Sequence, residues 1–153
     1  MRILVIVAFS VLAFANCQSS EGEQSAQQET PADIAIKAAA VEEGWDEIMK
    51  IHDDIMPISM KLPPIWEQLD SLKDTANEEE AVAMKESITT LQKVHKDMYD
   101  WMADSGAIKE RLENATDDNL NMIIEEEKLR IAQIKRETND AYEAVQALLK
   151  TEE

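Results

Sequence analysis

Three long segments of this sequence repeat apolar residues at alternating spacings of four and three, which constrains the fold more than any other feature. Such a repeat places the apolar side chains on one stripe of an α-helix. The first stripe is formed by Ile34, Ala38, Val41, Trp45, Ile48, His52, Ile55, Ser59, Leu62, Trp66 and Leu69. The second is formed by Ala81, Met84, Ile88, Leu91, His95, Met98 and Met102. The third is formed by Leu120, Ile124, Ile131, Ile134, Thr138, Ala141, Val145 and Leu148, with Glu127 as an interruption. Because the chain has only three Gly and four Pro, the repeat predicts an all-α protein.

Prolines are expected to deform the first helix, which should begin after Pro31. Pro57 removes one backbone hydrogen bond and should bend this helix near residues 52 to 54. Pro63-Pro64 disfavours helical geometry in the residue before the pair. We therefore expect a first helix that is kinked or broken at Pro57 and Pro63-Pro64, with a short continuation over about residues 64 to 74.

Capping residues predict the limits of the other two helices. Asn77 can cap the second helix, because its side chain can accept a backbone hydrogen bond and acidic residues follow it. Ser105-Gly106 indicates the end of that helix, and residues 107–115 are then a connector. Thr116 marks the start of a third helix of about 34 residues, on the order of 50 Å long.

Amphipathic helices of this length must bury their stripes against one another. Short connectors between three such helices favour an antiparallel, up-down-up three-helix bundle. An open coiled-coil oligomer, built from the same stripes, is the alternative.

The N-terminal segment predicts export. Met1-Arg2 precedes an apolar stretch over residues 3–15 that is too short for a membrane-spanning helix and is typical of a signal peptide. The following Cys17 is the only cysteine, so it has no partner for a disulfide within the chain. Residues 14–17 resemble the lipobox of bacterial lipoproteins, although Asn16 stands where that family usually carries Gly, Ala or Ser.

The resulting domain prediction is a signal peptide over 1–16, a lipidated Cys17 with a disordered tether over 17–31, and a helical bundle domain over 32–150. The lipid would attach the protein to a membrane of the bacterial cell envelope. The alternative is cleavage after Ala13-Phe14-Ala15, which would release a soluble protein with a free Cys17.

The charge of the chain excludes some partners. Its formal net charge is −17, and removal of Arg2 with the leader takes this to −18. Such a surface repels nucleic acid and anionic lipid headgroups, which bind clusters of Lys and Arg. Nucleic acid is therefore not an expected partner.

Both histidines lie on the apolar stripes, beside methionines. If the first and second helices fold back around residues 75–76, His95 is level with Met56 and His52 is level with Tyr99, so the two imidazoles are about 6 Å apart along the axis. With Met98, these side chains form a candidate metal site, because imidazole and thioether are suitable ligands for Cu(I). A His/Met pair could also ligate haem iron.

A simpler interpretation is structural, and under it no cofactor is expected. The methionines then fill the core, and each histidine contacts a neighbouring carboxylate or a carbonyl freed by Pro57. The three tryptophans Trp45, Trp66 and Trp101 are interpreted as packing anchors. The runs Glu125-Glu126-Glu127 and Asp53-Asp54 are interpreted as solvated faces. No arrangement for nucleophilic catalysis or phosphate binding is recognisable, so an enzyme is not expected.

Two short motifs carry a resemblance to a family. The runs His52-Asp53-Asp54-Ile55-Met56-Pro57 and Asp97-Met98-Tyr99-Asp100-Trp101-Met102, with a third helix that contains Lys128, Ile131 and Ile134, resemble small Bacteroidetes lipoproteins labelled viral A-type inclusion protein. The similarity covers about residues 34–149, and Pro63-Pro64 departs from the more continuous first helix of that family. The resemblance implies an envelope-anchored helical domain of unknown function, without catalytic residues.

The sequence thus predicts a non-enzymatic, envelope-anchored lipoprotein that acts through protein contacts. Its expected partners are the membrane, through the N-terminal lipid, and another protein or a second copy of the chain. The alternative is a bundle that binds copper or haem through His52, His95, Met56 and Met98.

Overall fold

A computed structural model describes residues 30–150. It contains the helices α1 (Pro31–Ser59), α2 (Leu62–Leu72), α3 (Glu78–Glu113) and α4 (Asp117–Lys150), and no strand occurs among the described residues. The all-α prediction is therefore confirmed. The predicted signal peptide, Cys17 and most of the predicted tether lie outside the described residues.

Helices α1 and α2 together form the bent first helix that the prolines predict. α1 continues through Pro57 and ends just before Met60-Lys61. Pro63-Pro64 then occupies the first turn of α2. The helix must be interrupted there because neither proline can donate a backbone hydrogen bond and each ring would clash with the carbonyl one turn earlier. α2 starts and ends two residues before the predicted range of 64–74.

The start of α3 follows the predicted cap. The side chain of Asn77 accepts a hydrogen bond from the Glu80 backbone N–H at 3.0 Å, and the Asn77 N–H donates to the Glu80 carboxylate at 3.1 Å. This reciprocal pair is a capping box. A second capping box, between Thr30 and Asp33, begins α1.

The predicted end of the second helix at Ser105-Gly106 is wrong, because α3 continues to Glu113. Gly106 has no left-handed backbone conformation, and a glycine inside a helix costs only about 1 kcal/mol. The two turns that follow bury Ile108 and Leu112 in the core. Burial of two large aliphatic side chains stabilises the helix by more than the glycine costs.

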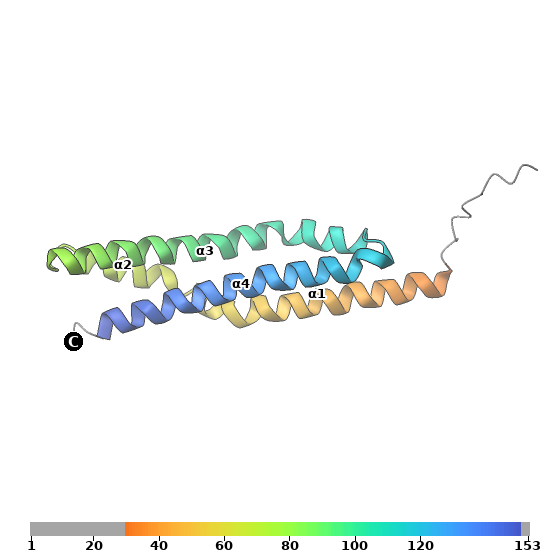
Figure 1. Cartoon of the computed structure of the whole chain (residues 1–153), viewed down its shortest axis with the longest axis horizontal. Coiled ribbons are helices and arrows are strands. Elements are labelled where there is room, and N and C mark those ends of the chain that lie inside the picture. The colour runs from red at the N-terminus through yellow and green to blue at the C-terminus, as the bar shows by residue number, and fades with distance from the viewer. Residues whose placement is uncertain (1–29, 151–153) are drawn as a thin grey trace, which may run out of the picture.

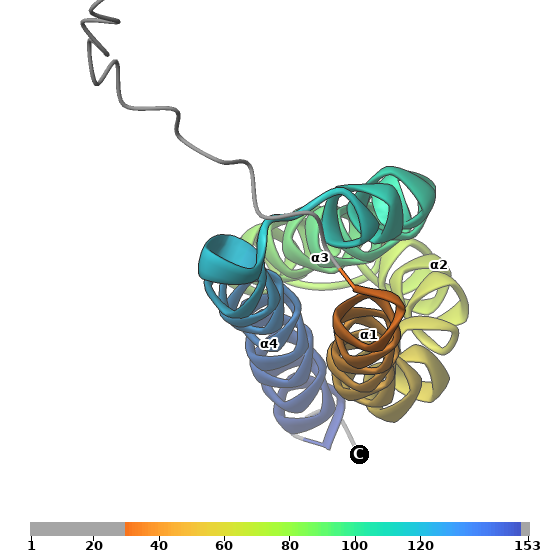
Figure 2. The same ribbon diagram turned by 90° about the vertical axis from the view of Figure 1, so that its right-hand side faces the viewer.

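The long helices lie side by side. α1 and then α2 run from one end of the molecule to the other, α3 returns alongside them, and α4 runs in the direction of α1 (Figure 1). Seen along the long axis, α1, α3 and α4 form a triangle, and α2 lies beside α3 (Figure 2). Within residues 30–150, no helix combines the length and apolar character that a bilayer crossing needs.

Ion pairs fix the register of α1 and α4. Lys128 Nζ lies 2.9 Å from Glu47 Oε2, and Lys135 Nζ lies 2.8 Å from Asp54 Oδ2. In each pair the two residues are 81 positions apart in the sequence. The second pair lies one heptad after the first on both helices. The Lys135 pair lowers the pKa of Asp54 through a hydrogen bond and the charge. A constant offset means that the two helices run parallel.

The core is divided along its length into two clusters. The first contains Val41, Ile48, Ile55, Met98, Trp101, Ile108, Leu112, Ala115, Leu120, Ile123, Ile124 and Ile131. The second contains Leu62, Leu69, Met84, Leu91, Val94, Ala141 and Val145. Ile58, just before the break, packs against both. α1 therefore covers one half of the α3–α4 pair and α2 covers the other.

α1 and α4 approach each other closely at Gly44. A Cβ atom at this position would lie 2.4 Å from Cδ1 and 2.7 Å from Cγ1 of Ile124. Ile124 is β-branched and its χ1 is restricted in a helix, so it cannot move away freely. By contrast, a Cβ at Gly106 would meet no atom within 4 Å.

We predict opposite effects of Gly→Ala at these two helical positions. Gly44→Ala should lower the free energy of unfolding by about 1 kcal/mol, because overpacking outweighs the gain in helix propensity. Gly106→Ala should raise it by about 0.5–1 kcal/mol through propensity alone. Urea denaturation followed by circular dichroism measures both. Stabilisation of equal size in the two variants would contradict the tight α1–α4 contact.

Candidate functional site

His52 lies on α1 against the first core cluster. Its ring stacks on Trp101, with centroids 5.5 Å apart, and its Nδ1 lies 2.9 Å from Asp53 Oδ1. The side chain is 13% exposed, and Nε2 is buried without a hydrogen-bond partner. One ring nitrogen therefore has the carboxylate contact that the structural interpretation predicts, and the other has none.

His95 lies against other residues. Its ring stacks on Tyr99 at 4.4 Å and meets Trp66 of α2 edge-on at 5.2 Å. Burial lowers the pKa of the His95 imidazole, because the protonated form is poorly solvated there. This environment favours a neutral ring.

The predicted His/Met residues are divided between these surroundings. Met98 is fully buried in the first core cluster, and half-buried Met56 packs against the same cluster, as His52 does through Trp101. The ring partners of His95 instead include Trp66, which packs against the second cluster. Among residues 30–150, no three His, Cys, Asp or Glu side chains are grouped so that they could hold a metal ion. Ligand binding by the four predicted residues stays a hypothesis.

The tryptophans are packing anchors, as predicted. Trp101 is 1% exposed and stacks on half-buried Trp45, with centroids 6.5 Å apart. Lys109 Nζ lies 5.9 Å from the Trp45 ring and 3.1 Å from Glu42 Oε1. Half-buried Trp66 packs against the second cluster. The stack of Trp45, Trp101 and His52 thus joins α1 to α3.

The interpretation of Glu127 as part of a solvated face is wrong, although Glu125 and Glu126 are exposed. Glu127 is only 3% exposed. Its Oε1 accepts a hydrogen bond from Arg111 Nη1 at 3.2 Å, and its Oε2 lies 3.8 Å from Arg130 Nη1. The helical period explains the burial, because Glu127 continues the apolar stripe of α4.

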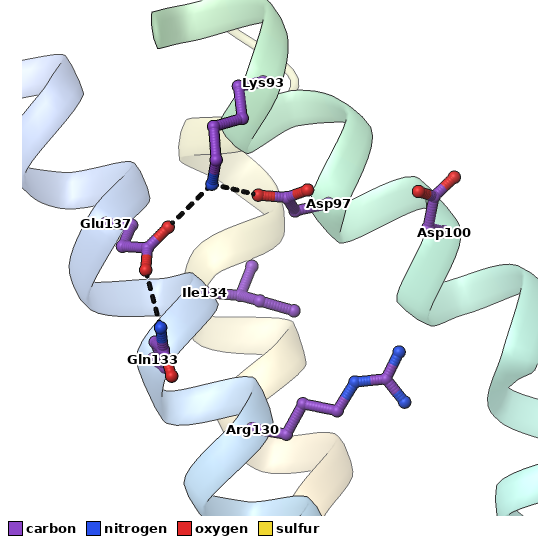
Figure 3. Close-up of a pocket in the computed structure, with 7 residues that line it drawn as sticks. All are labelled: Lys93, Asp97, Asp100, Arg130, Gln133, Ile134 and Glu137. Atoms are coloured by element: carbon purple, nitrogen blue, oxygen red, sulfur yellow. Dashed lines mark hydrogen bonds and ion pairs between the residues drawn. The ribbon is translucent and has the colours of Figure 1, made fainter.

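A charged groove of about 280 Å³ lies between α3 and α4 (Figure 3). Lys93 Nζ bridges Asp97 and Glu137 at 2.7 and 3.1 Å, and Gln133 donates to Glu137 at 2.8 Å. These hydrogen bonds, from Gln133 first and then Lys93, lower the pKa of Glu137. Figure 3 shows Ile134 beneath the bridge.

The charges of this groove neutralise one another. Arg130 Nη2 lies 3.2 Å from Asp104 Oδ2, and Asp100 pairs with Lys96. Each cation of the groove therefore already has a carboxylate partner. The pairs of Lys93 with Glu137 and of Arg130 with Asp104 connect α3 to α4. The charged side chains that line the groove are therefore already paired and are not available to a charged ligand.

A different surface is left where α1 extends past the other two long helices. At the α1–α4 offset of 81 residues, the first residue of α4, Asp117, is level with Ile36. Within residues 30–150, the earlier turn of α1 therefore extends past the beginning of α4, and Figure 1 shows it projecting beyond the α3–α4 turn. Ile36 is 70% exposed and Ile34 is 54% exposed. We call residues 31–37 the α1 overhang.

Two grooves flank the α1 overhang. The groove toward α3, of about 360 Å³, is lined by Ile34, Lys37, Ala38, Val41, Glu42 and Glu113. The groove toward α4, of about 270 Å³, is lined by Asp33, Ile36, Lys37, Ala40, Asp117, Leu120 and Asn121. Each has an apolar floor and an acidic edge, so this end of the molecule is the candidate interaction site.

Sequence reasoning did not identify this site. It placed Ile34 on the buried stripe, where the structure exposes it. The available signal was Ile36, an isoleucine off the stripe of an amphipathic helix. Exposed apolar side chains that cluster beside grooves mark interaction surfaces more often than single ones do.

Comparisons with known proteins give no further constraint on this site. No family model matches the chain, and neither a curated protein nor a solved structure does. The function must therefore be inferred from the residues of the chain itself.

Proposed function

We propose that this protein is a non-enzymatic lipoprotein of the bacterial cell envelope, anchored through an acylated Cys17, and that it acts through protein contacts at the α1 overhang. The observation that carries the proposal is the exposure of Ile34 and Ile36 beside two grooves with apolar floors. Burial of such side chains against a partner is a favourable source of binding energy. The resemblance to small Bacteroidetes lipoproteins agrees with an envelope location.

We further propose that the domain folds alone as an antiparallel, up-down-up three-helix bundle. The equal offsets of the two α1–α4 ion pairs support this arrangement. So does the pairing of Glu42 with Lys109, which joins the N-terminal half of α1 to the C-terminal half of α3. An oligomer formed by the stripes themselves would need them to be open, whereas Val41, Ile48 and Ile131 are buried within one chain.

Intact mass spectrometry of the protein from its own membrane tests the anchor. The expected mass is that of the chain from Cys17 onward with acyl groups attached. A mass that corresponds to cleavage after Ala15, without lipid, would refute the anchor and leave the contact surface to be tested separately.

Chemical crosslinking in the native envelope, followed by affinity purification, tests the contacts. We expect one protein to be recovered repeatedly, and recovery to fall when Ile34 and Ile36 are both replaced by Ser. Val82, which is 49% exposed on α3, provides the control variant Val82→Ser. Loss of the partner in both variants, or in neither, would contradict a role of the α1 overhang.

A second candidate function is Cu(I) binding near His52. It is favoured by the buried Nε2 atom of His52, which has no hydrogen-bond partner, and by the methionines of the first core cluster, whose Trp101 stacks on His52. Soft thioether and imidazole ligands suit Cu(I). Titration with Cu(I) in competition with a chromogenic chelator should give a weaker affinity for His52→Ala than for the parent protein. An equal affinity for both would exclude His52 as a ligand.

A further inference from the structure

We infer that the α1 overhang and its grooves bind an amphipathic helix with basic flanks from a partner protein, an inference that rests on the function proposed above. The site couples an apolar floor to an acidic edge. Among the residues that line the two grooves, Asp33, Glu42, Glu113 and Asp117 are acidic, and Lys37 alone is basic. A partner must therefore present an apolar stripe and positive charge together.

The shape of the site favours a helix. Ile34, Ala38 and Val41 continue the stripe by which α1 packs in the bundle, but α3 ends at Glu113 and leaves the beginning of that stripe uncovered. A helix laid into this position would extend the packing that α1 already makes with α3. Binding of an amphipathic helix by such a groove, through apolar anchors at helical spacing, is a recurrent mode of peptide recognition.

The charge of the site selects the partner. Lys109 pairs with Glu42, whereas no ion pair of the described residues 30–150 neutralises Glu113 or Asp117. A second copy of the chain would bring the same acidic edge, and its net charge of −17 would add repulsion. Anionic lipid headgroups would be repelled as well. Lys or Arg residues beside an apolar stripe complement the edge instead.

Binding of synthetic peptides to the purified full-length protein tests the inference. The probe is a fluorescent 18-residue helix with a leucine stripe and a lysine polar face; the comparison peptide carries glutamate in place of lysine. We expect the lysine peptide to bind, with an affinity that decreases as salt increases, and the glutamate peptide not to bind.

Matched variants distinguish the site from general attraction by an acidic protein. Ile34→Ser with Glu113→Lys changes one groove, and Val82→Ser with Glu86→Lys makes the same change near the other end of α3. The first pair should weaken peptide binding by about tenfold or more, and the second by much less. Equal weakening, or tighter binding of the glutamate peptide, would overturn the inference. Circular dichroism shows whether both variants keep their helices.

Photocrosslinking in the native envelope separates failure of the inference from failure of the proposed function. A photoreactive benzoylphenylalanine placed at residue 36 should capture a partner peptide that contains an apolar helical repeat and Lys or Arg. The same group placed at Leu129 of α4, which is 71% exposed, or at Val82 provides the comparison. Capture only from these two positions would keep the proposed protein contacts but overturn the docking site. Capture from none of the three positions would refute both. Capture of lipid at residue 36, or of a second copy of the chain, would replace the inferred partner.

Discussion

Trp101→Ala should lower the free energy of unfolding by about 3–5 kcal/mol, the cost typical of a large aromatic side chain deleted from a core. Trp101 is 1% exposed, and its ring lies between Trp45 and His52 of α1. The substitution would leave a cavity between α1 and α3 and remove both stacking contacts. Urea denaturation followed by circular dichroism at 222 nm measures the loss. A change smaller than about 1 kcal/mol would contradict the burial of Trp101.

Trp101→Phe is the matched control. Phenylalanine keeps a ring between Trp45 and His52 but removes the indole N–H, which is buried without a hydrogen-bond partner. Removal of an unpaired donor offsets part of the lost apolar contact. We therefore expect Trp101→Phe to cost less than half of Trp101→Ala. Equal costs would mean that a phenyl ring does not replace the packing of the indole between Trp45 and His52.

The fold could be predicted from the sequence because local and global signals agree. The heptad positions Val41, Ile48 and Ile55 of α1, and Ile131 of α4, are buried as the repeat requires. Even the polar stripe positions follow it, since Ser59 and Thr138 are fully buried. Where helices lie side by side, position on a stripe determines burial, because each helix must cover one face of the others. The polarity of a single side chain is a weaker influence.

The errors arose where a local signal was given more weight than the stripe. Gly106 was interpreted as a helix end, but the stripe continues to Leu112, and burial there outweighs the cost of the glycine. Glu127 was interpreted as solvated for its charge alone, although it falls at a stripe position. In both cases the tertiary contacts with the neighbouring helix determined the outcome.

The candidate site could be predicted only in part. Counting along the antiparallel register set His52 level with Tyr99, and the structure stacks His52 on Trp101, two residues away. It could not foresee that the break before α2 would bring Trp66 against His95. Nor could it foresee the α1 overhang, because exposure of Ile36 depends on where α3 and α4 end relative to α1. The positions of these helix ends relative to α1 depend on how the helices pack against one another. The sequence of one helix does not show them.

Arg111→Met should lower the free energy of unfolding by about 1–3 kcal/mol, because it removes the one hydrogen bond that the buried Glu127 carboxylate accepts within residues 30–150. Glu127 is 3% exposed and accepts that bond from Arg111, while Arg130 lies farther away at 3.8 Å. Arg111 is itself 45% exposed, so the expected loss is below that of a fully buried pair. Urea denaturation at neutral pH is the measurement. Lys96→Met, which removes a pair with exposed Asp100, is the control and should change stability by less than about 0.5 kcal/mol.

Glu127→Leu, by contrast, should not destabilise the protein. We expect the free energy of unfolding to stay unchanged or to rise by about 1 kcal/mol or more. A leucine at this stripe position removes the buried charge, and Arg111 and Arg130 remain hydrated because each is 45% exposed. The double variant Arg111→Met with Glu127→Leu should then regain most of the stability that Arg111→Met loses. If Glu127→Leu destabilised the protein as much as Arg111→Met, the buried carboxylate would contribute net stability to the bundle. If the predicted order holds, Glu127 lowers stability, and its value to the molecule lies in fixing the pairing of α3 with α4, since a shift of one heptad would separate it from Arg111.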